Sequence, residues 1–212
     1  MSTSKRKSIP SLVKDPKLIE KRREQIIAAA VELFISKGFH KTTTREISQA
    51  SGFSIGTLYE YIESKEDVLY LVCEYIHAEL EKRMKEALVD SQTGEQTLRQ
   101  AIRGFLYVME EMGDQVLLIY QESKSLPSET IKYVLQREEE ITGIFEMILK
   151  KGIADGSLKL DLHSVTLMAH NIVTLAEMWV FRRWALRKHY SLEDYIEMQT
   201  NLLLQELSKP KV

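Results

Sequence analysis

Apolar residues recur at steps of three and four along most of the chain, and this period most limits the fold. One example begins after Ser64, with apolar positions at Val68, Leu71, Val72, Tyr75, Ile76, Leu80 and Met84. No run alternates apolar and polar residues for long enough to predict a strand. Four Pro and nine Gly in 212 residues are too few for the many turns of a β-sandwich or barrel. The sequence therefore predicts an all-α protein of about nine helices.

Composition adds limits on class and compartment. Hydrophobic residues make up 44% of the chain and charged residues 28%, which is enough to bury a core. The single cysteine, Cys73, excludes a disulfide framework and a Cys-based zinc ribbon, and it fits a reducing compartment. The beginning of the chain lacks the apolar stretch of a signal peptide, and Leu162–Ala176 is too short to span a bilayer. We expect a soluble cytoplasmic protein without a membrane partner.

Charge is distributed unevenly along the chain. Residues 1–65 carry 12 Lys and Arg against 7 Asp and Glu, whereas the remainder carries 17 against 24. A basic first third joined to an acidic body is typical of a protein that meets a polyanion at one end. A solvated basic segment without a partner is the alternative.

Local signals divide the chain into helices. Residues 1–15 are basic and without periodicity, and we expect a flexible arm there. Asp15-Pro16 predicts a helix start, and Gly38 predicts its end, with Phe39 folding back on the last turn. Later helices are expected at Thr97–Met112, Gln115–Lys124, Ser128–Lys151, Leu162–Arg187 and Leu192–Leu207.

Two short helices between these segments form a helix-turn-helix pattern. Thr43 and Glu46 have the spacing of a capping box, and Ser54 is placed to cap a helix over Ile55–Tyr61. The turn Ser51-Gly52-Phe53 joins the two. In such units the second helix enters the major groove of DNA, while the first lies across the phosphates.

Polar groups around these helices suit that task. Thr43 and Thr44 lie at a helix N-terminus, where free N–H groups and the helix dipole favour a phosphate. Further hydroxyls and a positive charge come from Thr57, Tyr59, Tyr61 and Lys65. Gly56 indicates either a close approach of backbone to DNA or a poorly optimised helix.

Residues 26–72 resemble the DNA-binding head of the TetR family of bacterial transcription regulators. The resemblance rests on Ile27, Ala29, Ala30, Leu33, Phe34, Gly38, Phe39, Thr42-Thr43-Thr44-Arg45-Glu46-Ile47, Ala50-Ser51-Gly52-Phe53-Ser54, Gly56-Thr57-Leu58-Tyr59-Glu60-Tyr61-Ile62 and Ser64-Lys65-Glu66-Asp67-Val68-Leu69. The body resembles the family only in its helical character and length.

The resemblance implies that some head residues contact DNA phosphates and that others contact bases. Phosphate contacts are implied for Thr43, Tyr61 and Lys65, and Thr57 lies between the two groups of contacts. Base or base-adjacent contacts are implied for Arg45, Ser54, Ile55, Gly56 and Tyr59. It also implies a ligand pocket in the body and a homodimer built from the helices Leu162–Arg187 and Leu192–Leu207.

Bulky side chains of the body are candidates for that pocket, or simply for an ordinary core. They are Phe105, Met109, Met112, Tyr120, Phe145, Met168, Ile172 and Trp179. Arg182 and Arg183 stand between Trp179 and Trp184, where they could approach a phosphate-bearing ligand such as an acyl-coenzyme A or form a surface basic patch.

Other patterns favour ordinary structural roles. Cys73 and His77 have metal-ligand spacing but no second pair, so a core thiol and a helix-surface histidine are expected. His163 and His170 share a helix face, as ligands or as partly exposed histidines. Residues 52–56 match G-x-S-x-G, but a nucleophile elbow needs a preceding strand. We predict no metal, no cofactor and no enzyme activity.

The sequence as a whole predicts an arm over 1–15, a DNA-binding domain over 16–66 and a ligand-binding and dimerisation domain over 67–212. The predicted function is that of a repressor. It would bind a palindromic double-stranded operator as a homodimer and be released by a small hydrophobic effector. A DNA-binding adaptor of the same fold that does not regulate transcription is the alternative.

Overall fold

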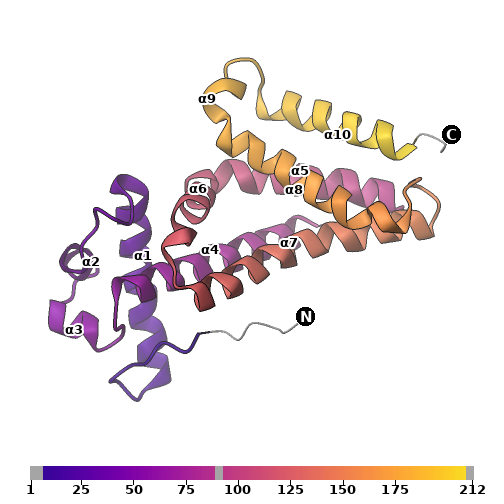
Figure 1. The fold of residues 1–212 in the computed structure, drawn as a ribbon. Coiled ribbons are helices and arrows are strands. Elements are labelled where there is room, and N and C mark those ends of the chain that lie inside the picture. Colours follow the sequence, from indigo (N-terminus) through magenta and orange to yellow (C-terminus); the bar gives the residue numbers. More distant parts are fainter. Residues whose placement is uncertain (1–6, 89–92, 209–212) are drawn as a thin grey trace. The chain divides into compact units, whose positions relative to one another are not determined.

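The computed structural model describes residues 7–88 and 93–208, and these residues form an all-α protein, as predicted (Figure 1). Ten α-helices and two short 3₁₀ segments occur within them, and no strand does. Their bounds are α1 Pro16–Lys37, α2 Thr44–Ala50, α3 Ile55–Tyr59, α4 Lys65–Ala87, α5 Gly94–Glu111, α6 Gly113–Glu122, η1 Ser123–Ser125, α7 Ser128–Ala154, η2 Leu162–Ser164, α8 Val165–Phe181, α9 Arg183–Leu186 and α10 Leu192–Ser208.

The chain forms two compact units. The first comprises Met1–Ala78 and Asp114–Arg137, and the second comprises Glu79–Gly113 and Glu138–Val212. Helices α4 and α7 each contribute to both units. Most of α6 and the start of α7 therefore belong with the head, whereas the sequence placed them in the body. The functional division at residue 66 stays a prediction.

The first unit is built around α1, whose start and end follow the sequence signals. Asp15 Oδ1 caps the helix by accepting from the backbone N–H groups of Lys17 and Leu18 at 3.0 and 3.4 Å. Gly38 ends it with φ 80°, a backbone conformation that favours glycine. The Phe39 ring returns to lie 5.4 Å from Phe34, edge to face. Helix α1 buries Ile26, Ala30, Val31 and Phe34, and it packs against α2.

The segment before α1 is hydrogen-bonded to the head over residues 7–12, within the expected flexible arm. Leu12 N donates to Glu60 O at 2.9 Å, and Lys7 Nζ pairs with Asp67 Oδ1 at 2.5 Å. Ile9 is 7% exposed. The remainder of the predicted arm at residues 1–6 lies outside the described residues.

In the second unit, α5 packs against both α8 and α10. The sequence predicted one continuous helix over Leu162–Arg187, and this prediction is wrong because the helix is interrupted. Arg182 leaves helical geometry at φ −111° and ψ 18°, so α8 ends at Phe181 and the short α9 follows. The apolar period runs across this break, which is why the sequence pattern did not locate it.

The segment formed by η2 and α8 also has the composition of a membrane span. Among the described residues, Leu162–Phe181 alone is long and apolar enough to cross a bilayer, and it is longer than the stretch considered in the sequence analysis. The same composition occurs in a core helix of a folded protein. The buried residues of α8 recur at three- and four-residue steps apart from two adjacent pairs: Val165, Ala169, Ile172, Val173, Ala176, Trp179 and Val180.

Candidate nucleic-acid interface

Helix α2 starts at the capping box that the sequence predicted. Glu46 N donates to Thr43 Oγ1 at 3.2 Å, and Thr43 N donates to Glu46 Oε2 at 2.8 Å. Lys37 of α1 forms an ion pair with the same carboxylate. Hydrogen bonds from Lys37 and Thr43 lower the pKa of Glu46 to about 2. The end of α1 and the start of α2 are thereby joined by charge.

The turn and α3 complete the predicted helix-turn-helix. Gly52 has φ 77°, and Phe53 N donates to Ser48 O at 2.8 Å, which closes the turn. Ser54 Oγ caps α3 by accepting from Thr57 N at 3.0 Å. Helix α3 ends at Tyr59, two residues earlier than predicted. Tyr61 N donates to Leu58 O, three residues back, and so forms a turn in place of a further helical bond.

The two short helices present one exposed surface. Arg45, Ser54, Gly56 and Tyr59 are exposed, and so is Ile55 at 39%. The Tyr59 hydroxyl donates to Thr44 Oγ1 at 3.2 Å and links α3 to α2. Thr43 is also exposed, whereas Thr44 and Thr57 are half-buried. The structure thus gathers most of the predicted DNA-contacting residues on neighbouring helices.

Lys65 and Tyr61 are placed differently from the other predicted contacts. The Lys65 ammonium donates to the carbonyl oxygens of Phe39, His40 and Thr42 at 3.0, 3.5 and 3.1 Å. An ammonium has three donors, so Lys65 uses its full capacity on the loop before α2. Tyr61 is 4% exposed, with its ring 6.4 Å from Phe53. Their phosphate contacts stay predictions.

Glu122 at the end of α6 contacts the same loop, and the sequence analysis missed it. Its Oε1 accepts from Phe39 N at 3.3 Å, and its Oε2 lies 3.9 Å from His40 Nε2. Ser125 Oγ is 3.3 Å from His40 Nε2. Glu122 is 83 positions from Phe39 along the chain, so no local pattern could have found the contact.

Gly56 offers a test in which stability and DNA binding change in opposite directions. A Cβ at Gly56 would meet only Ser54 Oγ at 3.7 Å, an ordinary contact, so packing within the protein does not require glycine. Gly56→Ala is expected to raise the free energy of unfolding by up to about 1 kcal/mol through helix propensity. The same methyl group should weaken DNA binding by roughly tenfold or more if backbone approaches the duplex there. Urea denaturation and fluorescence anisotropy measure the two effects, and unchanged DNA affinity would favour the alternative of a poorly optimised helix.

The predicted effector residues fall into two sets. Phe105, Met109, Met112, Phe145, Ile172 and Trp179 are buried in the second unit, where Met168 is half-buried. Tyr120 is 68% exposed and belongs to the first unit. The rings of Phe105 and Phe145 lie 5.4 Å apart. Phe105 and Ile172 line a cavity of about 10 Å³, room for about one water molecule.

The two tryptophans near the break after α8 have different surroundings. Trp179 Nε1 donates to Glu110 Oε2 at 2.7 Å, and Arg187 pairs with the same oxygen at 2.6 Å. Trp184 is 65% exposed, and the Arg182 guanidinium lies 5.3 Å from the centre of its ring. Arg182 is therefore a surface cation beside an exposed aromatic ring.

The histidines and the cysteine occupy both buried and surface positions. His77 is buried at 3% exposure, which corrects the expected helix-surface position, because the α4 face that carries it packs inward. Its Nδ1 lies 2.9 Å from Cys73 O, and burial lowers the pKa of His77 to about 4. Burial raises the pKa of the Cys73 thiol to about 12. His170 Nε2 lies 3.8 Å from Glu139 Oε2 on the surface.

Glu177 on α8 should make the stability of the second unit depend on pH. Partial burial, with the nearby Glu138 carboxylate, raises the pKa of Glu177 to about 7. The native state therefore binds more protons than the unfolded state between about pH 4.5 and pH 7, and stability falls as the pH rises through that window.

Glu177→Gln is accordingly expected to raise the melting temperature at pH 8 and to change it little at pH 4.5. Glu86→Gln, at an exposed position of the same unit, is the matched control. Differential scanning calorimetry measures the melting temperatures of both variants and of the original protein at the two pH values. An equal effect of the two substitutions at pH 8 would refute the assignment.

Comparison with known proteins matches two segments of the chain to family models. Residues 26–70 match the family model for bacterial regulatory proteins of the tetR family, and residues 91–183 match the tetracyclin repressor-like C-terminal domain. The HTH-type transcriptional regulator HbdR of Aromatoleum sp. (strain CIB) is 28% identical over 205 residues. That match covers 97% of this chain and 89% of HbdR.

Solved structures share the fold. A tetR-family regulator from Rhodococcus RHA1 superposes with a TM-score of 0.76 at 21% identity and covers 90% of this chain and 99% of its own. AibR, solved in complex with isovaleryl coenzyme A and operator DNA, gives a TM-score of 0.72 at 19% identity and covers 86% and 98%. The capped helix-turn-helix, the all-α body and the two family matches together show that this chain is a DNA-binding transcription regulator of the TetR family.

Proposed function

We propose that the protein is a repressor that binds a palindromic operator as a homodimer and leaves it when a small hydrophobic effector binds. The observation that supports the proposal is the exposed surface of α2 and α3. This surface holds the five residues with implied base or base-adjacent contacts: Arg45, Ser54, Ile55, Gly56 and Tyr59. Recognition helices in a two-fold dimer meet two half-sites about one helical turn apart, which favours a palindrome.

Exposed apolar side chains on α8 and α10 support the homodimer. Leu167, Met198 and Leu202 are 66%, 50% and 56% exposed. Helices that expose large apolar residues on one face and bury the other commonly pack against a partner.

Leu202→Glu is therefore expected to shift the protein from dimer to monomer, since it places a charge on the proposed interface. Met147→Glu is the matched control, because Met147 is 64% exposed on α7, outside the proposed interface. Light scattering at several concentrations measures the mass. A dimer that survives Leu202→Glu as well as Met147→Glu would contradict this interface.

For the effector we propose an acyl-coenzyme A. The crystallised complex of the structural relative AibR with isovaleryl coenzyme A and DNA supports this class. Arg182 beside Trp184 offers a surface cation for the coenzyme phosphates. Ligand pockets commonly enclose about 300 Å³ or more. The cavity of about 10 Å³ beside Phe105 and Ile172 would have to open, so binding would shift the protein toward a state with separated helices.

Selection of random duplex DNA on the purified protein at a stated salt concentration tests the operator, because affinity depends strongly on salt. An enriched palindrome is the expected result. The enriched duplex is then titrated with isovaleryl-coenzyme A, palmitoyl-coenzyme A and free coenzyme A. Release by a thioester but not by free coenzyme A supports the effector class. Release by none of them overturns the proposed effector class but does not contradict the proposed operator. Enrichment of many unrelated sites, without any response to a ligand, would favour the alternative of a non-regulatory adaptor.

A further inference from the structure

We infer that residues 7–13 form a strap that holds the turn after the recognition helix, and that Arg23 and Asp67 are positioning residues for specific DNA recognition. The inference rests on the DNA-binding role proposed for α3. It concerns how α3 is held rather than which bases it contacts.

Helix α3 needs support at its end because it is only five residues long. Isolated helices of that length are not stable in water, so contacts with the rest of the protein fix their direction. Ser54 and Thr57 secure the beginning of α3. The end passes into the turn of residues 60–64, which leads to α4 at Lys65.

The strap makes its first contacts at the start of this turn. Leu12 N and Ser11 Oγ both donate to Glu60 O, at 2.9 and 2.8 Å. Glu60 is the residue directly after α3. Its carbonyl oxygen is therefore held from outside the helix-turn-helix by a segment that precedes α1.

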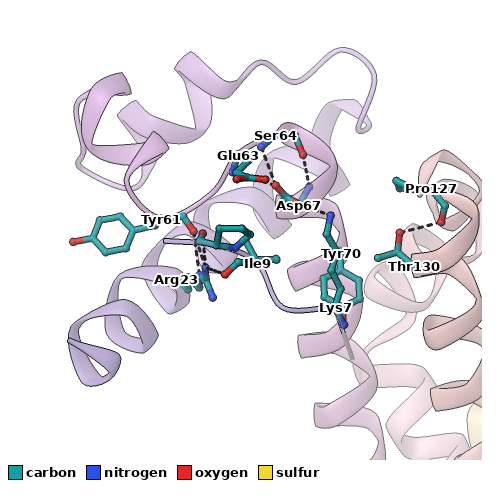
Figure 2. Close-up of polar contacts among 11 residues, drawn as sticks. Lys7, Ile9, Arg23, Tyr61, Glu63, Ser64, Asp67, Tyr70, Pro127 and Thr130 are labelled. Carbon is teal, nitrogen blue, oxygen red and sulfur yellow. Dashed lines mark hydrogen bonds and ion pairs between the residues drawn. The ribbon is translucent and has the colours of Figure 1, made fainter. Parts of the chain in front are cut away.

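Arg23 of α1 bridges the strap and the turn (Figure 2). Its Nε and Nη2 donate to Tyr61 O at 3.1 and 2.9 Å. Nη2 also donates to Ile9 O at 2.8 Å and to Pro10 O at 3.2 Å. One guanidinium thus joins three carbonyl oxygens from two chain segments, and hydrogen bonds from a charged donor are among the stronger ones in proteins.

Asp67 makes the second bridge, at the other end of the turn (Figure 2). Its Oδ2 accepts from Glu63 N at 3.1 Å and Ser64 N at 2.9 Å, while Oδ1 pairs with Lys7 Nζ at 2.5 Å. Asp67 is 2% exposed. Burial would raise the pKa of Asp67, but the bonds from Lys7, Ser64 and Glu63 outweigh it and hold that pKa below its usual value. The carboxylate therefore stays charged and bound to both segments.

Two further contacts fix the strap on the first unit. Lys7 N donates to the Tyr70 hydroxyl at 3.0 Å, and Ile9 is buried at 7% exposure. The strap is thus bound at Lys7, Ile9, Ser11 and Leu12, and the turn is bound to it at both ends. Loss of the strap would remove both bonds to Glu60 O and the strap's side of the two bridges, and would leave Tyr61 O bonded to Arg23 alone.

The test compares a chain lacking residues 2–13 with a chain lacking residues 2–6, which keeps the strap. Arg23→Met and Asp67→Asn remove the two bridges, and Lys21→Met is the matched control because Lys21 is an exposed cation on the same helix. The probes are the duplex enriched by the full chain and a scrambled duplex of equal composition. Circular dichroism checks that each variant keeps its helix content.

The ratio of affinities for the enriched and scrambled duplexes should fall by about tenfold to a hundredfold without the strap or either bridge. The chain lacking residues 2–6 and Lys21→Met should keep the ratio of the full chain. A positioning role lowers the ratio, whereas loss of charge or general stability lowers both affinities together. An unchanged ratio, or an equal loss for both duplexes, overturns the inference.

Hydrogen exchange of residues 55–64 separates this inference from the proposed operator. Exchange there should be faster without residues 2–13 than without residues 2–6, whether or not any duplex is enriched. If the full chain enriches no duplex but exchange responds to the strap, the operator proposal fails while the strap remains. Exchange that is equal in the two chains overturns the strap.

Discussion

Lys65→Met is expected to lower the free energy of unfolding by about 2 kcal/mol, because hydrogen bonds from a charged group are lost. It should also weaken binding to the enriched duplex by more than tenfold. The ammonium donates to three carbonyl oxygens between Phe39 and Thr42 and lies 4.2 Å from the centre of the Phe39 ring. That loop sets the position of Thr43, which caps α2. Methionine keeps most of the side chain's apolar length but leaves the carbonyl oxygens without their donor.

Urea denaturation and fluorescence anisotropy at fixed salt measure the two quantities. Lys41→Met is the control, since Lys41 is an exposed cation in the same loop. Lys65→Arg should recover part of the stability, because the positive charge is kept and only the geometry differs. Equal losses from Lys41→Met and Lys65→Met would show that charge near DNA, rather than support of the loop, explains the effect.

Gly94→Ala is expected to destabilise the second unit by about 3 kcal/mol, the upper part of the range for overpacking. A Cβ at Gly94 would lie 2.2 Å from both Cα and N of Gly152. These are backbone atoms, which cannot move aside as the end of a side chain can. Separation of α5 from α7 would also strain the bond from Gly94 N to Asp155 Oδ2, 2.6 Å long.

Gly143→Ala supplies the matched control for this prediction. Gly143 lies within α7, and a Cβ there would meet no atom within 4 Å. Alanine should therefore raise stability by up to about 1 kcal/mol through helix propensity. Calorimetry of the two variants should give melting temperatures that change in opposite directions. A Gly94→Ala protein as stable as the original would mean that the two helices tolerate a wider spacing.

Local signals predicted the helix-turn-helix because its supporting bonds join residues close in sequence. Asp15 caps residues two and three positions ahead, and the Thr43–Glu46 and Ser54–Thr57 bonds each span three positions. Gly38 and Gly52 have positive φ, which the chain's own sterics reserve mainly for glycine. The start and character of these elements could therefore be predicted without knowledge of the packing.

Side chains with long-range partners were predicted less well. The phosphate contact of Lys65 stays a prediction, but no local pattern indicated that its ammonium donates to carbonyl groups 23 to 26 positions away. The sequence analysis gave Arg23 no role, because its acceptor Tyr61 O is 38 positions distant along the chain. His77 was expected on a surface, because periodicity gives the faces of a helix but not which neighbours cover them.

By itself, then, the sequence determined the all-α class, the caps of α1, α2 and α3, the helix-turn-helix and the family. The tertiary structure alone decided that Arg23 and Asp67 bridge residues 7–13 to the turn after α3, that Gly94 lies against Gly152, and that α8 ends before Arg182. The physical reason is the distance along the sequence over which each kind of interaction acts. Capping and helical period act over a few residues, whereas bridges and backbone packing depend on segments that only folding brings together.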